Sequence, residues 1–142
     1  MNTIKTTENT TEMNIKEKLS LLWIVVMFTM VFADIVGFMN PGALKDIIDG
    51  AVGFQITQGL LLAFAVLLEI PIAMIFLSRV LDHKVNRWAN IIASVITILF
   101  VIGGGTQYLS YIFFASVEVI CMLVIIWLAW NWKTPEDAIP KK

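Results

Sequence analysis

The sequence contains few charged residues and no excess of positive charge. Charged side chains make up 15% of its 142 residues, whereas soluble domains carry about a quarter. Hydrophobic residues account for 58%, and this balance indicates lipid as the surrounding solvent. The formal net charge of −1 and the lack of a basic stripe exclude nucleic acid as an expected partner.

Motifs for catalysis and for metal binding are also missing. The single cysteine, Cys121, cannot form an internal disulfide, a thiol redox pair or a cysteine-based zinc site. The sequence has no HExxH or CxxC motif, no glycine-rich phosphate loop and no serine-nucleophile motif. We therefore predict no catalytic residue, no metal ligand and no cofactor, and we favour a function other than catalysis.

What the sequence does contain is four long apolar stretches. They cover residues 19–39, 59–80, 88–104 and 109–130. Each is close to the ~20 residues that a helix needs to cross about 30 Å of hydrocarbon, and backbone groups in lipid must be paired within the segment. The prediction is an all-α membrane protein, a bundle of four transmembrane helices. Neighbouring helices are expected to be antiparallel because the second and third links are short.

Polar segments flank this predicted transmembrane domain, which extends over residues 16–132. Residues 1–15 are rich in Thr, Asn and Glu and have too little apolar content to fold alone, so they predict a disordered tail. Residues 133–142 are polar, contain two prolines, and predict a second tail.

The link between the first two spans has a helical pattern of its own. Asn40 suits a helix cap and Pro41 suits the first helical position. Leu44, Ile47 and Ile48 then share one face, with charged residues elsewhere. We expect a short amphipathic helix lying on the outer membrane surface.

Basic residues are distributed unevenly between the two sides of the predicted bundle. Of the ten Lys and Arg residues, only Lys45 lies on the side of the first and third links. The positive-inside rule therefore predicts a multi-pass protein of the cell membrane with both termini in the cytoplasm. A cleavable signal peptide is the alternative for the first span, but the apolar run there continues to full spanning length.

Three carboxylic acids, Asp34, Glu69 and Glu118, lie inside the predicted spans. A carboxylate at the bilayer centre costs about 2.5–3.5 kcal/mol, so these side chains are expected to face the bundle interior. Glu69 and Glu118 fall near mid-membrane and Asp34 about a turn and a half further out. No Lys, Arg or His lies deep in a span. Either the acids carry protons or a cation occupies a shared cavity; alternatively, each is a neutral carboxyl hydrogen-bonded to a neighbouring helix.

Other residues complete the predicted cavity. Asn90, Ser94 and Thr97 recur at helical spacing and form a stripe that is expected to face the acids. Ordinary packing of membrane helices uses the same residue types, so that interpretation stays open. Tyr111 lies about two turns from the last acid and is expected to donate a hydrogen bond to it. Pro71 removes a backbone hydrogen bond and predicts a kink in the second span.

Five segments together resemble an uncharacterised prokaryotic family of small four-span membrane proteins, a domain of unknown function. The segments are residues 32–35, 69–74, 85–90, 103–105 and 113–118. The resemblance covers about residues 17–132 and implies a bacterial inner-membrane protein, without implying an activity. The four-span size is also similar to that of the DoxX-like proteins, and the depth of the acids to the sterol-isomerase and sigma-2-receptor-like family. No functional residue is carried over from either.

The leading functional hypothesis is a small binding or transport protein whose acidic cavity holds protons or a cationic or amphipathic ligand. An alternative is an accessory or assembly subunit whose acids pair with a cationic residue of a partner. A second alternative is a lipid-modifying, isomerase-like enzyme that uses a buried acid as proton donor. The expected partners are therefore the lipid bilayer, a small cationic or hydrophobic ligand, and another membrane protein or a second copy of the chain.

Overall fold

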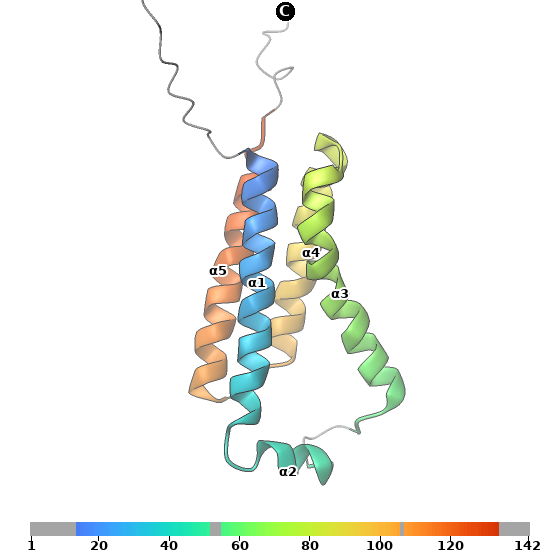
Figure 1. Ribbon diagram of the computed structural model, residues 1–142, viewed down its shortest axis with the longest axis vertical. Coiled ribbons are helices and arrows are strands. Elements are labelled where there is room, and N and C mark those ends of the chain that lie inside the picture. Colours follow the sequence, from blue (N-terminus) through green and yellow to red (C-terminus); the bar gives the residue numbers. More distant parts are fainter. Residues whose placement is uncertain (1–13, 52–54, 106, 134–142) are drawn as a thin grey trace, which may run out of the picture.

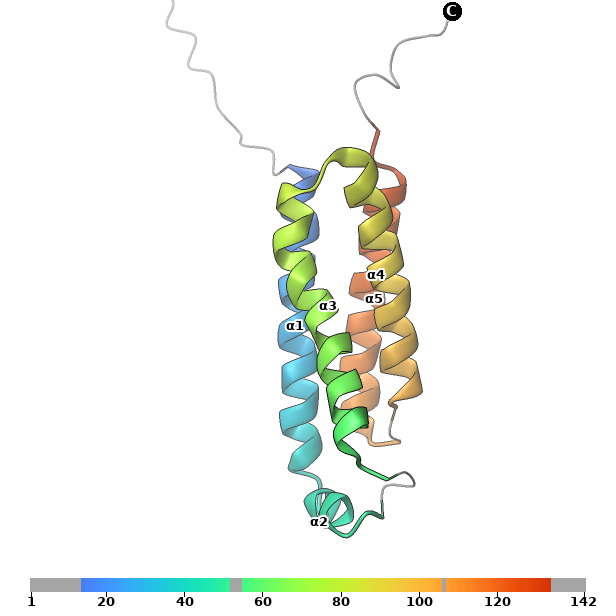
Figure 2. The same cartoon turned by 90° about the vertical axis from the view of Figure 1, so that its right-hand side faces the viewer.

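The computed structural model describes residues 14–51, 55–105 and 107–133. These residues form five helices: α1 (Ile15–Phe38), α2 (Ala43–Ile48), α3 (Gln58–Val80), α4 (His83–Gly103) and α5 (Leu109–Trp130). The four long helices run up and down in a bundle, and α2 crosses one end of it (Figures 1 and 2). Each long helix is long and apolar enough to cross a membrane. The predicted all-α bundle of four transmembrane helices, with a short helix between the first two, is confirmed.

The long helices form a ring in which each packs against two antiparallel neighbours. Helix α1 packs against α3 and α5, and α4 packs against the same two helices. As a result, α1 stands diagonally opposite α4, and α3 diagonally opposite α5. We call the end that holds the start of α1 and the end of α5 the terminal end, and the opposite end the α2 end (Figure 1).

The start of α4 differs from the predicted third span. The apolar run predicted a helix from residue 88, whereas α4 begins at His83. The backbone N–H of Asn86 donates to the carbonyl of Asp82 at 2.8 Å, so the charged segment is the first turn of the helix and not a loop. Hydropathy marks where a helix enters lipid, while its hydrogen-bonded backbone continues into the polar flank.

The two predicted tails lie almost entirely outside the described residues. They were expected at residues 1–15 and 133–142, and the described chain runs from residue 14 to residue 133. At the N-terminal boundary, α1 begins at Ile15, the last residue assigned to the predicted tail. The side chain of Asn14 accepts a hydrogen bond from the backbone N–H of Lys16 at 3.3 Å and caps the helix.

Helix α2 is present, but its start differs from the prediction. Gly42 precedes the helix with a φ of 88°, a left-handed conformation that glycine adopts without steric cost. Pro41 therefore lies before the helix and not in its first turn. The side-chain amide of Asn40 donates to the carbonyl of Gly37 at 3.1 Å, so this residue closes the end of α1 instead of capping α2. No residue of α2 is buried, and the helix packs loosely on the bundle.

The fully buried residues of α3 all lie in its C-terminal half. The buried residues of this helix are Pro71, Met74 and Ser78, whereas residues 58–70 include none. Figure 1 shows the N-terminal half of α3 leaning away from α4. Pro71 lies between the two halves, where it cannot donate a backbone hydrogen bond to the preceding turn.

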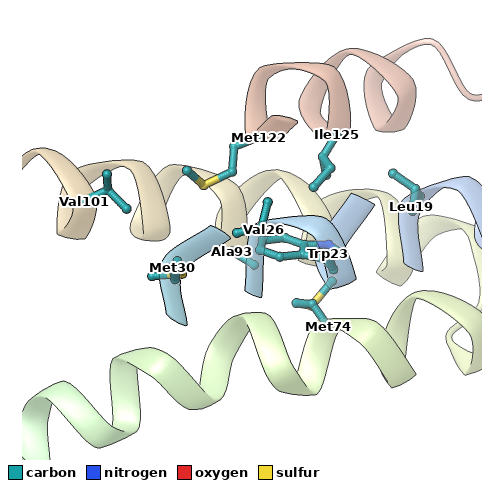
Figure 3. Packing of buried hydrophobic residues seen from close by; sticks show 9 residues of the cluster. All are labelled: Leu19, Trp23, Val26, Met30, Met74, Ala93, Val101, Met122 and Ile125. Carbon is teal, nitrogen blue, oxygen red and sulfur yellow. The ribbon is translucent and has the colours of Figure 1, made fainter. Parts of the chain in front are cut away.

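Large apolar side chains fill the centre of the bundle. The buried cluster in Figure 3 consists of Leu19, Trp23, Val26, Met30, Met74, Ala93, Val101, Met122 and Ile125. Trp23 is fully buried and comes from α1. Further large apolar residues, such as Phe28, Leu99 and Trp127, are exposed on the outside. An apolar exterior around a packed apolar interior suits a protein surrounded by lipid.

Candidate functional site

Glu118 is the one acidic residue that is buried within the described chain. It lies on α5, is 3% exposed, and shares its face of the helix with the buried residues Met122, Ile125 and Ala129. Its carboxyl takes part in none of the side-chain hydrogen bonds formed among the described residues. No hydrogen-bond donor of the described residues compensates this group for its lost hydration.

Asp34 is the charged neighbour of Glu118. Helices α1 and α5 pack side by side, and the two carboxyls are close enough to interact electrostatically. Asp34 is exposed and lies about one turn from the end of α1 at Phe38. We call Asp34 and Glu118 the acid pair. It extends from near the α2 end towards the middle of the bundle.

Tyr111 binds the backbone of α4 and not Glu118. Its hydroxyl donates to the carbonyl of Val101 at 2.6 Å, so the prediction that it donates to Glu118 is wrong. The last carbonyls of a helix have no partner within the helix, and the one at Val101 is such a group. This bond fixes how α4 and α5 are aligned along their length.

Ser94 lies level with Glu118 along the bundle. Counted inward from the bond between Tyr111 and Val101, each of them is about two turns further along its own helix. Ser94 is fully buried, and its hydroxyl has no hydrogen-bond partner in the described part of the chain. Thr97 is also buried, but its hydroxyl donates to a carbonyl of its own helix at 2.8 Å. The middle of the bundle thus holds a carboxyl and a hydroxyl that both lack hydrogen-bond partners among the described residues.

The basic side chains of the described residues lie at the ends of the long helices or outside these helices. They are Lys16, Lys18, Lys45, Arg79, His83, Lys84, Arg87 and Lys133. The guanidinium carbon of Arg87 lies 5.1 Å from the centroid of the Trp130 ring, and Nε of Arg79 donates to the hydroxyl of Ser20 at 3.0 Å. The acid pair therefore has no internal cation in this part of the chain. Nor do three or more His, Cys, Asp or Glu residues gather there to hold a metal ion.

Glu69 lies apart from the acid pair. It is exposed on α3, which stands diagonally opposite α5 in the ring, and it is not among the charged groups that act on Glu118. Of the three acids expected to share a cavity, Asp34 and Glu118 lie on the neighbouring helices α1 and α5, and Glu69 lies on the outside of α3.

A second polar cluster joins three helices closer to the terminal end. Nε1 of Trp23 donates to Oδ1 of Asn90 at 2.7 Å, and the hydroxyl of Ser78 donates to the same oxygen at 3.1 Å. Nδ2 of Asn90 donates to Oδ1 of Asn86 at 2.6 Å, and Nδ2 of Asn86 donates to the carbonyl of Ser78 at 2.7 Å. All four residues are fully buried. We call this cluster the amide network.

The amide network was not predicted as a unit. Asn90 was expected to belong to a stripe facing the acids, whereas in the structure it pairs with Trp23, Ser78 and Asn86. Two signals were present: the spacing of four residues between Asn86 and Asn90, and a tryptophan whose N–H needs a partner when it is buried. The saturated hydrogen bonding of the network indicates that it holds helices together.

The acid pair differs from the amide network because its carboxyls form no hydrogen bonds with the described residues. A buried carboxyl without a fixed donor can take up and release a proton, or accept a cation as its partner. An open, mostly apolar groove runs between α4 and α5, lined by residues that include Val101, Gly105, Tyr111, Ala115 and Val119. Ala115 and Val119 are near neighbours of Glu118 along α5, but Glu118 itself does not line this groove.

Comparison with known proteins identifies a family but assigns it no activity. A family model described as "Family of unknown function (DUF6326)" matches residues 7–139, nearly the whole chain. No curated protein and no solved structure matches. The expected resemblance to a family of unknown function is confirmed, whereas the similarity to DoxX-like proteins stays a prediction.

Proposed function

Because this chain belongs to the DUF6326 family of unknown function, we propose a function from its site. The protein is a small membrane binding or transport protein whose acid pair binds protons or a cationic ligand. One observation carries the proposal: Glu118 is 3% exposed and has neither a hydrogen-bond donor nor a cation among the described residues. A carboxylate in such a place costs about 2.5–3.5 kcal/mol, and binding a proton or a cation removes most of that cost.

A proton is the ligand that the buried position of Glu118 favours, because it needs no added space. Asp34, exposed and nearer the α2 end, is the group through which a proton reaches Glu118. The distribution of Lys and Arg supports an orientation with both termini in the cytoplasm of a bacterial inner membrane. In that orientation the acid pair exchanges protons with the outside.

A larger ligand is supported by the groove between α4 and α5. A lipophilic cation can place its apolar part against Val101, Ala115 and Val119 and its charge towards Glu118. Proton release on binding such a cation follows from this arrangement, since one carboxyl cannot hold both. The hydroxyl of Ser94 supplies a further polar contact at the same level.

The test is direct observation of the Glu118 carboxyl in purified protein reconstituted into vesicles. Infrared spectra are recorded over a range of pH, with and without tetraphenylphosphonium as the cation. We expect a carbonyl band of a protonated carboxyl that Glu118→Gln removes and that tetraphenylphosphonium diminishes in the wild-type protein. Glu69→Gln is the matched control, because it makes the same chemical change on an exposed residue at similar depth.

The outcome that contradicts the proposal is a titrating band that Glu118→Gln leaves unchanged. If Glu118→Gln removes the band but tetraphenylphosphonium does not diminish it in the wild-type protein, the ligand is restricted to protons. Proton flux into vesicles, followed with an internal pH dye, then separates transport from binding: a transporter loses the flux in Glu118→Gln and keeps it in Glu69→Gln.

A further inference from the structure

Glu69 points away from the bundle at the middle of a membrane span. Helix α3 runs from Gln58 to Val80, so Glu69 is its central residue. The buried residues of the helix are Pro71, Met74 and Ser78, and at about 100° per residue Ser78 lies about 180° around the helix from Glu69. Because Glu69 is also exposed, its carboxyl faces whatever surrounds the bundle.

The surface around Glu69 is apolar, and the side chains next to Glu69 along the helix are small. Its large members are Leu62, Val66 and Phe76, which are 66%, 59% and 65% exposed. Ala65 and Ala73, one turn to either side of Glu69, add only methyl groups. We call this surface the Glu69 face. Small residues at this spacing allow the backbones of two membrane helices to approach closely, so the face has the shape that a second helix requires.

The described residues supply no partner for this acid. The carboxyl of Glu69 forms no hydrogen bond with any group in the described ranges. Ionisable residues inside membrane spans normally face a protein interior and pair with other groups, because contact with hydrocarbon is costly. A partner for Glu69 is therefore to be sought outside the described residues.

Charge complementarity indicates what that partner is. A second copy docked through the same face brings another Glu69, and two carboxyls at close range repel each other. The basic residues of the described spans, such as Lys16, Arg79 and Arg87, all lie near the terminal end and cannot reach mid-depth in a partner copy. A helix of a different protein with Lys or Arg at mid-depth satisfies the carboxylate and removes its cost.

We propose that the Glu69 face is the docking surface for a transmembrane helix of another protein that carries a Lys or Arg at mid-depth. The chain is thereby a subunit of a membrane complex. This proposal rests on α3 alone and does not depend on ligand binding by the acid pair.

The test uses a defined helix as the probe. The full-length protein, labelled with a donor dye, is reconstituted into phosphatidylcholine vesicles together with an acceptor-labelled poly-leucine transmembrane peptide that has one central lysine. We expect energy transfer to show stronger association with this peptide than with an otherwise identical all-leucine peptide. In Glu69→Gln, association with the lysine peptide falls about tenfold, as for loss of one charge-assisted hydrogen bond, and association with the leucine peptide does not change.

Two variants control for folding and for the other acids. Glu118→Gln makes the same change inside the bundle and is expected to bind the lysine peptide like the wild-type protein. Glu69→Asp keeps the charge and is expected to keep the preference for lysine. The proposal is overturned if the wild-type protein does not distinguish the two peptides, or if Glu69→Gln and Glu118→Gln lose the preference equally. It is also overturned if Glu69 instead drives self-association of this chain in the same vesicles.

Discussion

Asn90 is the residue on which the amide network depends. Its side-chain oxygen accepts hydrogen bonds from Trp23 and Ser78, and its nitrogen donates to Asn86. One side chain thus links α1, α3 and α4. Its bond to Trp23 crosses the ring diagonally from α4 to α1. Because all of these groups are fully buried, no water replaces a partner that is lost.

Replacing Asn90 is therefore expected to destabilise the protein. Asn90→Ala leaves the indole N–H of Trp23 and the hydroxyl of Ser78 without their acceptor, and a buried unsatisfied group costs about 1–3 kcal/mol. Two orphaned donors place the expected loss above the ~0.6 kcal/mol average of single interhelical bonds in membranes. The free energy of unfolding, measured by tryptophan fluorescence in mixed detergent micelles, checks this.

Asn131→Ala is the matched control for this experiment. Asn131 is exposed, and its amide donates only to the carbonyl of Trp127 in the same helix, at 3.0 Å. We expect this variant to stay within about 0.5 kcal/mol of the wild-type protein, as surface changes do. Equal losses in the two variants mean that the amide network does not contribute to stability.

The sequence predicts which residues are unusual better than it predicts where they point. Glu69 and Glu118 have much the same sequence context: each is a single acid in an apolar helix, with small residues one turn away. The structure buries Glu118 and exposes Glu69. On a helix that is apolar all round, periodicity does not define the inner face, so only the packing of neighbouring helices separates the two acids.

Among the elements, α4 is the one whose inner face the sequence does define. Its polar residues recur on one side, and Asn90, Ser94 and Thr97 are all buried. Helices α3 and α5 lack such asymmetry, and the half of α3 before Pro71 contains no fully buried residue. The bend in α3 determines how far the helix that carries the Glu69 face lies from α4.

Removing Pro71 is expected to bring the N-terminal half of α3 closer to α4. Pro71→Ala restores a backbone donor, and proline kinks commonly exceed about 20°. Over the ten residues to Leu61, about 15 Å of helix, straightening by that angle moves the helix about 5 Å. Spin labels at Leu61 and Ile102, both exposed, measure this distance by pulsed electron resonance in a Cys121→Ser background.

A second label pair tests whether the movement is confined to the far half of α3. Phe76 lies beyond Pro71, and Trp88 lies on α4; both are exposed. Their separation should stay constant when Pro71 is replaced. An unchanged distance between Leu61 and Ile102 contradicts the role given to Pro71, and equal shifts in both pairs indicate a general rearrangement of the bundle.

At the scale of the whole molecule, the bundle follows from the length of the four apolar runs and from the lipid that surrounds them. Four apolar runs near the length of a bilayer, the last three joined by short links, leave few arrangements other than an up-and-down ring. Hydropathy does not supply the helix ends, such as the start of α4 at His83, or the function of the family. Nor does hydropathy predict the orientation of the bundle across the membrane, which the placement of Lys and Arg predicts instead.

That direction decides on which side of the membrane Asp34 lies, and it is testable. Lys45 is the one basic residue on the α2 side, so we expect the α2 end to face outward. In a Cys121→Ser background, cysteines are placed singly at Asp49 and Asn131, which are exposed at opposite ends. An impermeant maleimide should label Asp49→Cys in intact spheroplasts and Asn131→Cys only after permeabilisation. The reverse pattern moves Asp34 to the cytoplasmic side, and labelling of both in intact cells means that the chain inserts in two directions.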